Sequence, residues 1–444
     1  MNPKPVFAFV TIGSGSYLGS TMRDVTLANL LHRRGFKVMF YWMLEWKRDL
    51  LDPGITQRLL CHGTRYQFVQ PSGFLDNVIG TLLFLLPLQW RVATAQSING
   101  YTDRLFRNLV RALHEAPRPD PPLTRRLQRF LSRDGVSHLM MSFASIGPLA
   151  LAARKGGNAF EYLLTFQGDE EFAECARRAG LLEQYQSRLA DAIAGSAWPA
   201  VVISHDYQLR IEQDMGVPAT RLQVIYNGVH NPDATSKPDI AILRQAFPEL
   251  ADTSTLVSYV GRQEPEKGLD LLLYAAKLLE SQGVAIQLVV CGSTAKGSSY
   301  KKIIADLARH LRLPIIQTGP ISAEVRNALY AHSRCVVCPS VNREPFGLVA
   351  TEAMAYGAPV LVPEYGGIAE VIRAGDQVGG LTFKTWDSGH LARQLGRLLR
   401  DDALHAELAA NARRVAAAFT DEKMADRILA HLDIPLPTNP LATP

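Results

Sequence analysis

The 444-residue sequence has few cysteines and no long apolar segment, and both shortages narrow the classes of protein that it can be. Its 5 cysteines are odd in number and irregularly spaced, which argues against a disulfide-stapled fold. Cys335 and Cys338 lie in an apolar run that predicts a buried strand, so we interpret both as core residues rather than metal ligands. The longest apolar run, residues 82–88, is too short to span a bilayer and is broken by Pro87.

Two further signatures are missing near the start of the chain. The first apolar run, residues 6–12, leads directly into a glycine-rich loop rather than a cleavage site, so a cytoplasmic protein is expected. The loop lacks the spacing of the dinucleotide-binding fingerprint, and the strand predicted after it does not end in an acid. Both features argue against a nicotinamide cofactor.

Charge is unevenly distributed along the chain. Residues 1–230 contain 25 Lys and Arg against 19 Asp and Glu, a net of +6, and the remainder contains 22 against 23, a net of −1. Eight arginines lie between residues 101 and 133. They can form a solvated helical face over a core. The sharper hypothesis is that residues 78–133 meet an anionic membrane surface or an anionic lipid-linked acceptor. Nucleic acid is not an expected partner.

Predicted strands alternate with predicted helices through both halves of the chain. Residues 5–11 favour a buried strand, residues 20–34 a helix and residues 36–41 a second strand, which is the opening βαβ unit of a doubly wound sheet. The alternation starts again at Leu256, after a linker-like segment at residues 231–238. The sequence therefore predicts an α/β fold with two doubly wound, Rossmann-like domains.

Two acids, Glu344 and Glu352, flank a predicted helix start. Residues 345–348, Pro-Phe-Gly-Leu, favour a tight loop, and the residues after them can form a helix until Gly357. Glu344 should lie in the loop and Glu352 about one turn inside the helix. Unpaired N–H groups at a helix start favour phosphate. This combination indicates a ligand with hydroxyls at both ends and phosphate between them, such as a nucleotide-sugar.

A cationic loop follows the strand predicted from Leu256. The order Gly-Arg, four residues, Lys-Gly places Arg262 and Lys267 on one loop. An arginine fork and a lysine point charge at the top of a strand can hold a diphosphate. Either cation alone would be an ordinary surface residue, but the two together with the Glu344 stretch predict a phosphate site.

On these motifs, the sequence resembles the retaining glycosyltransferases of the two-domain GT-B class, family 4 (glycosyl transferases group 1). The resemblance covers most of residues 200–420 and the first domain only loosely. It implies two domains that face each other across a cleft. An acceptor-binding domain is expected at residues 1–230 and a nucleotide-sugar-binding domain at 231–415. Residues 416–444 are expected to form a helix that crosses back to the first domain and a disordered tail.

The resemblance also implies roles for individual residues. Glu344, Arg262 and Lys267 would be catalytic, with Glu344 facing the donor sugar and the two cations stabilising the leaving diphosphate. The sequence has no Asp-x-Asp string, which metal-dependent glycosyltransferases of another fold use, so no metal is expected, and no cofactor beyond the nucleotide-sugar. The implied donor-binding residues are Glu352 on the ribose, the helix start at Phe346, Gly347 and Leu348, Ile321 near the base, and Gly13 and Gly15 of the first glycine-rich loop.

The sequence departs from the family on the acceptor side. A strand predicted at residues 162–166 ends at Gln167, where many family members carry a His. Glutamine can hydrogen-bond a sugar but cannot titrate, so no general base is expected at this position. Asp169 is the nearest candidate carboxylate for that role, although it can equally complement the dipole of the helix that follows.

The implied reaction is transfer of a hexosyl group to an acceptor hydroxyl with retention of configuration. A UDP-sugar is the favoured donor and GDP-mannose the next, with a sugar, glycolipid or lipid-linked acceptor in cell-surface polysaccharide or glycolipid synthesis. The expected location is the cytoplasm, including the inner face of the membrane. Two alternatives stay open: a nucleotide-sugar epimerase or hydrolase on the same fold, and a non-catalytic nucleotide-sugar-binding module.

Overall fold

The chain forms two compact α/β units. The computed structural model describes residues 4–13, 19–43, 48–61, 101–115, 119–157, 159–233, 237–250, 255–294 and 298–436. Unit 1 comprises Met1–Ile203, Gln208–Ile225 and Ala425–Pro444, and unit 2 comprises Ser204–Tyr207 and Tyr226–Met424.

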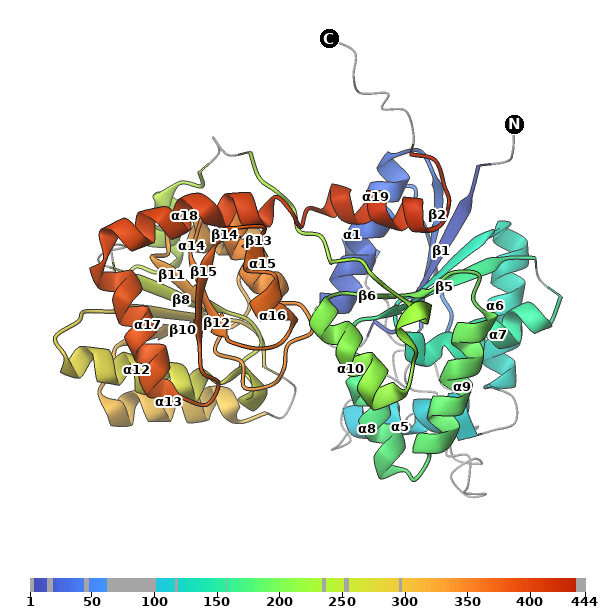
Figure 1. The fold of residues 1–444 in the computed structure, drawn as a ribbon, viewed down its shortest axis with the longest axis horizontal. Helices are drawn as coiled ribbons and strands as arrows, with labels where there is room; N and C mark the ends of the chain where they lie inside the picture. Colours follow the sequence, from blue (N-terminus) through green and yellow to red (C-terminus); the bar gives the residue numbers. More distant parts are fainter. Residues whose placement is uncertain are drawn as a thin grey trace, which may run out of the picture. The chain divides into compact units, whose positions relative to one another are not determined.

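The sheet of unit 1 has 7 strands in the order β3-β2-β1-β4-β5-β6-β7, and every neighbouring pair is parallel. β1 therefore lies between β2 and β4, where the strand order reverses. Strands β1, β2, β5 and β6 of this sheet are labelled in Figure 1. The strands are β1 (Val6–Thr11), β2 (Lys37–Trp42), β3 (Thr56–Leu59), β4 (His138–Met141), β5 (Glu161–Phe166), β6 (Ala200–Val202) and β7 (Leu222–Val224).

Helices connect these strands as the parallel order requires. The first, α1 (Gly19–Arg33), buries Leu27, Ala28 and Leu31, which recur at helical spacing. Within the described residues, the other helical elements of this part of the chain are η1 (Arg48–Leu50), α5 (Tyr101–Val110), the π-helix η2 (Arg111–Glu115), α6 (Pro121–Asp134), η3 (Ala144–Ile146), α7 (Gly147–Lys155), α8 (Glu170–Arg178), α9 (Leu182–Gly195), α10 (His205–Met215) and η4 (Ala219–Arg221).

The main sheet of unit 2 has 6 parallel strands in the order β10-β9-β8-β11-β12-β15. Its order reverses between β8 and β11. The strands are β8 (Leu256–Val260), β9 (Gln287–Cys291), β10 (Ile315–Gln317), β11 (Cys335–Val337), β12 (Val360–Pro363) and β15 (Gly380–Phe383), and β13 (Arg373–Ala374) pairs with β14 (Gln377–Val378) in a separate hairpin.

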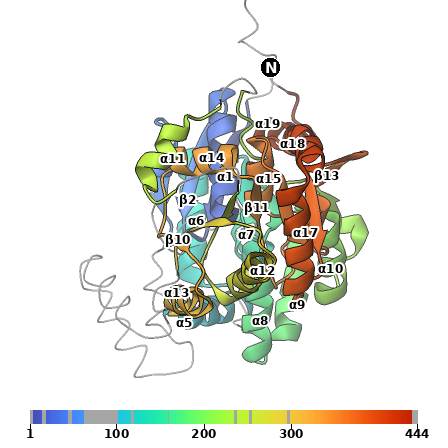
Figure 2. The same ribbon diagram turned by 90° about the vertical axis from the view of Figure 1, so that its left-hand side faces the viewer.

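Alternate strand residues in unit 2 bury two different cores. Val257 and Tyr259 pack with α12 and α17 on one face, whereas Leu256 packs with α11 and α14 on the other (Figures 1 and 2). Burial on both faces explains the near-continuous apolar strands. The helical elements are α11 (Ile240–Ala246), η5 (Pro265–Lys267), α12 (Leu269–Ser281), α13 (Tyr300–Leu311), α14 (Ala323–His332), α15 (Leu348–Ala355), α16 (Gly367–Glu370), α17 (Ser388–Arg400), α18 (Asp402–Ala416) and α19 (Asp421–His431).

Two chain segments run side by side where unit 2 begins and ends. Val229 forms an isolated parallel bridge with Thr420. A Cβ on Gly228 would lie 2.3 Å from the Cα of Asp421, so only glycine permits this approach. The last helix, α19, has its first four residues in unit 2 and the rest in unit 1.

The two Rossmann-like sheets confirm the predicted α/β class, but several elements had no clear sequence signal. β3, Thr-Gln-Arg-Leu, is an edge strand without an apolar run, and β6 has only 3 residues. Cys335 and Cys338 are buried, as expected of core residues. The apolar run at 82–88 lies outside the described residues, and no helix within those residues is long and apolar enough to cross a membrane.

Candidate active site

Three adjacent strand ends form the floor of the candidate site in unit 2. Gly261 N–H donates to Cys291 O at 3.0 Å, and Gly292 N–H donates to Gly319 O at 3.0 Å. A Cβ on Gly292 would lie only 1.7 Å from Gly261 O. The loops after β8, β9 and β10 are thus in backbone contact, which requires glycine where they meet.

Gln263, which sequence reasoning missed, ties these loops together. Its buried amide donates to Gly292 O at 2.9 Å and to Thr318 O at 2.7 Å. Its oxygen accepts from Gln317 Nε2 at 2.7 Å. A fully hydrogen-bonded side chain at this position fixes the loop that carries Arg262 and Lys267.

Lys267 and Glu344 meet across the point where the strand order of unit 2 reverses. Lys267 follows β8 and Glu344 follows β11, and Lys267 Nζ donates to Glu344 Oε1. Ser340 Oγ donates to the same oxygen at 2.5 Å. Both of these hydrogen bonds end on Oε1. Within the described residues Glu344 Oε2 has no hydrogen-bond partner, so it can accept a hydrogen bond from a ligand. Ligands of doubly wound sheets bind at this kind of topological switch point.

The neighbours of Glu344 favour its ionised form. Burial by itself raises the pKa of this carboxyl, but the charge of Lys267, the hydrogen bonds from Lys267 and Ser340, and the charge of Arg262 outweigh burial. The pKa of Glu344 is therefore below its ordinary value, although its side chain is only 19% exposed. Glu344 is a carboxylate acceptor at neutral pH.

Arg262 lies on the same loop with its guanidinium at the surface. Its side chain is 39% exposed, and Nη2 is 3.2 Å from Glu266 Oε1. The Glu266 carbonyl in turn accepts from Val341 N at 3.0 Å, which joins the β8 loop to the β11 loop. This exposed ion pair is weak and can open to receive an anion.

The start of α15 lies between the two predicted acids, as the sequence indicates. Gly347 has φ +105° and no side chain caps the helix, so the first N–H groups of α15 have no intrahelical acceptor. A Cβ on Gly347 would lie 2.5 Å from Ile368 Cγ1. Phe346 is buried against Tyr226 and Phe419, so only its backbone can face a ligand. Leu348 is the first residue of the helix.

Glu352 lies on α15, about one turn from its start, as predicted. Its Oε2 accepts from Tyr330 Oη at 3.2 Å and lies 4.0 Å from Arg326 Nε. Burial raises its pKa, and the charge of Arg326 and the tyrosine hydrogen bond oppose the shift. Its side chain stays 29% exposed and can contact a ligand. Tyr330 and Arg326 carry no motif that could have marked them as its neighbours.

The structure says less about the other residues that we predicted to bind the donor. Ile321 is half-buried, two residues after Gly319 in the loop between β10 and α14. Gly13, in unit 1, is buried with φ +63°, which favours glycine. Gly15 lies outside the described residues. Within those residues, no three His, Cys, Asp or Glu side chains gather as a metal site would require.

On the acceptor side, Gln167 and Asp169 belong to one buried hydrogen-bond network in unit 1. Asp169 Oδ1 accepts from Ser145 N at 2.8 Å and from Ser145 Oγ at 2.5 Å, and Oδ2 accepts from Gln167 N at 3.1 Å. Burial raises the pKa of Asp169 to about 7 against these hydrogen bonds. Its carboxylate is engaged within the unit, and a role toward an acceptor stays a prediction.

Solved structures of glycosyltransferases share this architecture. Anabaena HepE in complex with UDP and glucose is 18% identical, with a TM-score of 0.70 over 97% of this chain and 99% of that one. Sucrose-phosphate synthase from Thermosynechococcus elongatus is 20% identical, with a TM-score of 0.71 over 97% and 98%. The chain therefore has the two-sheet α/β fold of the GT-B class.

A family model matches part of the second half of the sequence. Residues 244–415 match the model described as glycosyl transferases group 1. This region contains Arg262, Lys267 and Glu344, the motifs on which the resemblance to that family was based, so the match agrees with the prediction over these residues.

Curated relatives match over only part of their length. D-inositol 3-phosphate glycosyltransferase of Salinispora arenicola is 34% identical over 47% of this chain and 49% of that protein. Lipopolysaccharide 1,2-N-acetylglucosaminetransferase of Salmonella typhimurium is 29% identical over 55% and 63%. The chain thus spans about half to two thirds of the length of these relatives.

Proposed function

We propose that the protein is a retaining hexosyltransferase that moves a sugar from a nucleoside diphosphate sugar to an acceptor hydroxyl. The observation that carries the proposal is the contact of Lys267 with Glu344 at the switch point of unit 2, beside the uncapped start of α15. Both residues lie within the region that matches glycosyl transferases group 1. We assign donor binding to unit 2 and acceptor binding to unit 1.

The reaction breaks the bond between the anomeric carbon and the diphosphate oxygen, whose electron pair leaves with the diphosphate. Lys267, Arg262 and the first N–H groups of α15 stabilise the charge that builds there. The acceptor oxygen bonds to the anomeric carbon on the same face, and its proton passes to the departing phosphate oxygen. This route retains configuration and assigns no step to a protein nucleophile, a metal or an organic cofactor.

The two acids position the two ends of the donor. Glu344 is ionised, and its Oε2 accepts from a hydroxyl of the sugar. Glu352 accepts from the ribose hydroxyls. Holding both ends fixes the anomeric carbon against the cations, which lowers the entropic part of the barrier.

The favoured donor is a UDP-sugar, with GDP-mannose next. UDP occupies the HepE structure, and the Salmonella relative is named for N-acetylglucosamine transfer to lipopolysaccharide. These likenesses support a sugar or a lipid-linked glycan as acceptor, in cell-surface polysaccharide or glycolipid synthesis.

The test combines calorimetric binding of UDP-, GDP- and ADP-sugars with NMR of the product. Glu344→Ala should abolish transfer and leave UDP binding within about threefold, since the nucleotide contacts remain. Glu324→Ala, an exposed acid in the first turn of α14, is the matched control. Undiminished transfer by Glu344→Ala would overturn the site. Turnover of the donor without any acceptor would instead indicate a hydrolase or epimerase.

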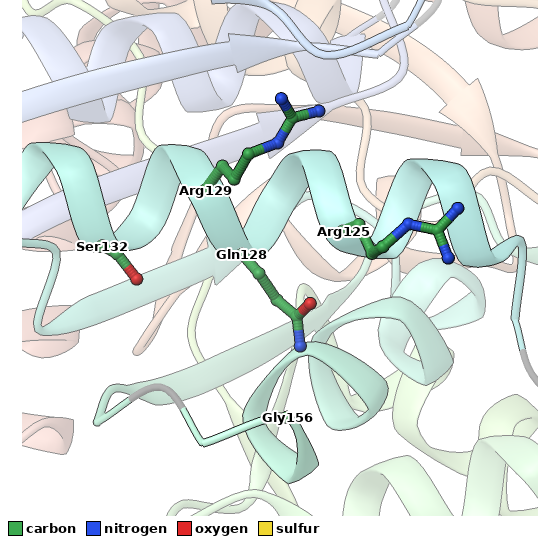
Figure 3. Close-up of a pocket in the computed structure, with 5 residues that line it drawn as sticks. All are labelled: Arg125, Gln128, Arg129, Ser132 and Gly156. Atoms are coloured by element: carbon green, nitrogen blue, oxygen red, sulfur yellow. The ribbon is translucent and has the colours of Figure 1, made fainter.

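We also propose that α6 meets an anionic membrane surface at the cytoplasmic face. Its exposed arginines are Arg125, Arg126, Arg129 and Arg133. Arg125 and Arg129 line a shallow hollow of about 530 Å³ that also includes Gln128, Ser132 and Gly156 (Figure 3). None of the described residues that line this hollow is acidic, so its field favours anionic headgroups.

Liposome co-sedimentation tests this surface. Binding should require anionic lipid and should weaken in Arg125→Glu/Arg129→Glu, because each cation near the surface contributes about 1 kcal/mol. Arg309→Glu, on the exposed face of α13, is the control. Equal sedimentation with neutral and anionic liposomes, or no sedimentation with either, would contradict the proposal.

A further inference from the structure

The topological switch point of unit 1 holds polar groups whose hydrogen bonds are incomplete. β1 lies between β2 and β4. Ser142 N–H donates to Val10 O at 3.1 Å, so the ends of β4 and β1 are adjacent, and Gln167 follows the neighbouring strand β5. Ligands of open α/β sheets bind outside the carboxyl ends of the strands at such a point.

Arg23, on α1, is the most unusual of these groups. It is 2% exposed, and its Nη1 donates to Asp24 Oδ1 at 3.0 Å. Among the residues that the structure describes, its Nε and Nη2 find no hydrogen-bond partner. A buried guanidinium with two unpaired donors is costly, because each of these donors has given up its hydrogen bonds to water without gaining an acceptor in the protein.

Gln167 is held in the same network and is also incomplete. Its Nε2 donates to Ser142 O at 2.7 Å and to Asp24 Oδ2 at 3.3 Å. Its Oε1 has no hydrogen-bond partner in the described part of the chain, although the residue is only 6% exposed. The two oxygens of Asp24 thus bind Arg23 and Gln167, one each, and orient both side chains.

The unpaired atoms define the chemistry of the missing partner. Two N–H groups on one edge of a guanidinium match two oxygens of a single oxyanion. Apolar groups cannot satisfy them, and a neutral hydroxyl leaves the charge of Arg23 balanced by Asp24 alone. The amide oxygen of Gln167 requires a donor, which a hydroxyl supplies.

We propose that unit 1 binds an oxyanion of the acceptor, a phosphate monoester or a carboxylate, through Nε and Nη2 of Arg23. Gln167 Oε1 accepts from a hydroxyl of the same molecule. The proposal rests on the glycosyltransferase function above and narrows its acceptor to an anionic one. Gln167 then has a binding role that does not depend on titration.

The experiment is calorimetry on the full chain with UDP at saturation, so that the nucleotide site is filled. The probes are myo-inositol 1-phosphate against myo-inositol, and glucuronate against glucose. The anionic member of one pair should bind at least about tenfold more tightly, since a charged hydrogen bond contributes about 1.5–3 kcal/mol. The pair that shows the contrast identifies phosphate or carboxylate. Arg23→Gln should lose the preference, and Arg177→Gln, on the surface of α8, should keep it.

A second variant tests the proposal independently, in case Arg23→Gln does not fold. Gln167→Glu is isosteric and places a carboxylate in the network that holds Arg23, so it should also remove the preference. UDP titration of each preparation reports separately on the donor site and on folding. Equal affinity for both members of each pair in the unaltered protein overturns the proposal, as does retention of the preference by both variants. Displacement of the anionic probe by UDP also overturns it, because the oxyanion would then belong to the donor.

Discussion

The switch points of the two units have equivalent positions in their sheets but hold their charges differently. In unit 2, Lys267 and Glu344 pair on loops and stay partly exposed. In unit 1, Arg23 and Asp24 pair in the interior. Two N–H donors of Arg23 have no hydrogen-bond acceptor among the described residues. In the first arrangement both charges are already paired, and Glu344 Oε2 stays available to a ligand. The second is incomplete until an anion arrives. Sheet topology places both sites, and the residues near the strand ends decide their chemistry.

Removing Lys267 should have the largest effect on this comparison. Lys267→Met should lower the transfer rate by about 10²–10³, because a stabilising charge on the leaving diphosphate is lost. The pKa of Glu344 should rise, because burial is then opposed by fewer charges. The acidic limb of the pH–rate profile should therefore move to higher pH. Initial rates across the acidic range check this, with Lys277→Met on α12 as control.

A methyl group at Gly347 should be the next most damaging change. Gly347→Ala combines a left-handed backbone with a clash against Ile368, so about 2–4 kcal/mol of stability should be lost. Gly283→Ala also has positive φ but meets nothing within 4 Å, and should cost about 1 kcal/mol. Urea unfolding of unit 2 measures the free energy of unfolding of the two variants, Gly347→Ala and Gly283→Ala. Equal losses would mean that the clash contributes nothing.

The buried network of unit 1 should make its stability depend on pH. The pKa of Asp169 is about 7 in the folded protein and ordinary when unfolded, so the folded state binds more protons between these values. Its contribution to stability is present at low pH and is lost as pH rises through about 7. Between pH ~5 and ~7.5 the loss should be roughly 2 kcal/mol. Asp169→Asn should remove this dependence in urea unfolding, and an unchanged slope would contradict the assignment.

Ser340 provides the smallest expected effect. Ser340→Ala removes one of the two hydrogen bonds to Glu344 Oε1 while Lys267 stays in place. The transfer rate should fall by about tenfold, because that factor corresponds to the free energy of one hydrogen bond to a charged group. Ser281→Ala, at the exposed end of α12, should leave the rate unchanged. A loss as large as that of Lys267→Met would mean that Ser340 contacts the donor directly.

Most of the candidate donor site could be predicted from the sequence because its residues follow strands in short motifs. Arg262 and Lys267 share one loop, and Glu344 and Glu352 flank one helix start. Ser340 lies four residues before Glu344 and could have been suggested on proximity alone. Gln263, Tyr330 and Arg326 could not, because their contacts join loops and helices that are distant in the sequence.

The buried network of unit 1 was harder to predict for the same reason. Asp24 lies on the helical stripe that contains Leu27, Ala28 and Leu31, and a charge on a buried stripe was an available signal. One of its two partners, Gln167, follows β5, and only the fold brings that strand end next to α1.

The sequence by itself determined the α/β class, the two Rossmann-like sheets and the loops that carry Arg262, Lys267, Glu344 and Glu352. These features depend on local periodicity and short spacing, which the order of residues specifies directly. Only the tertiary structure decided that Lys267 pairs with Glu344 and that Asp169 is engaged inside unit 1. It also decided that Arg23 is buried with two N–H donors that have no hydrogen-bond acceptor among the described residues. Burial and hydrogen-bond partners depend on segments far apart in the chain, which pack together only in the folded protein.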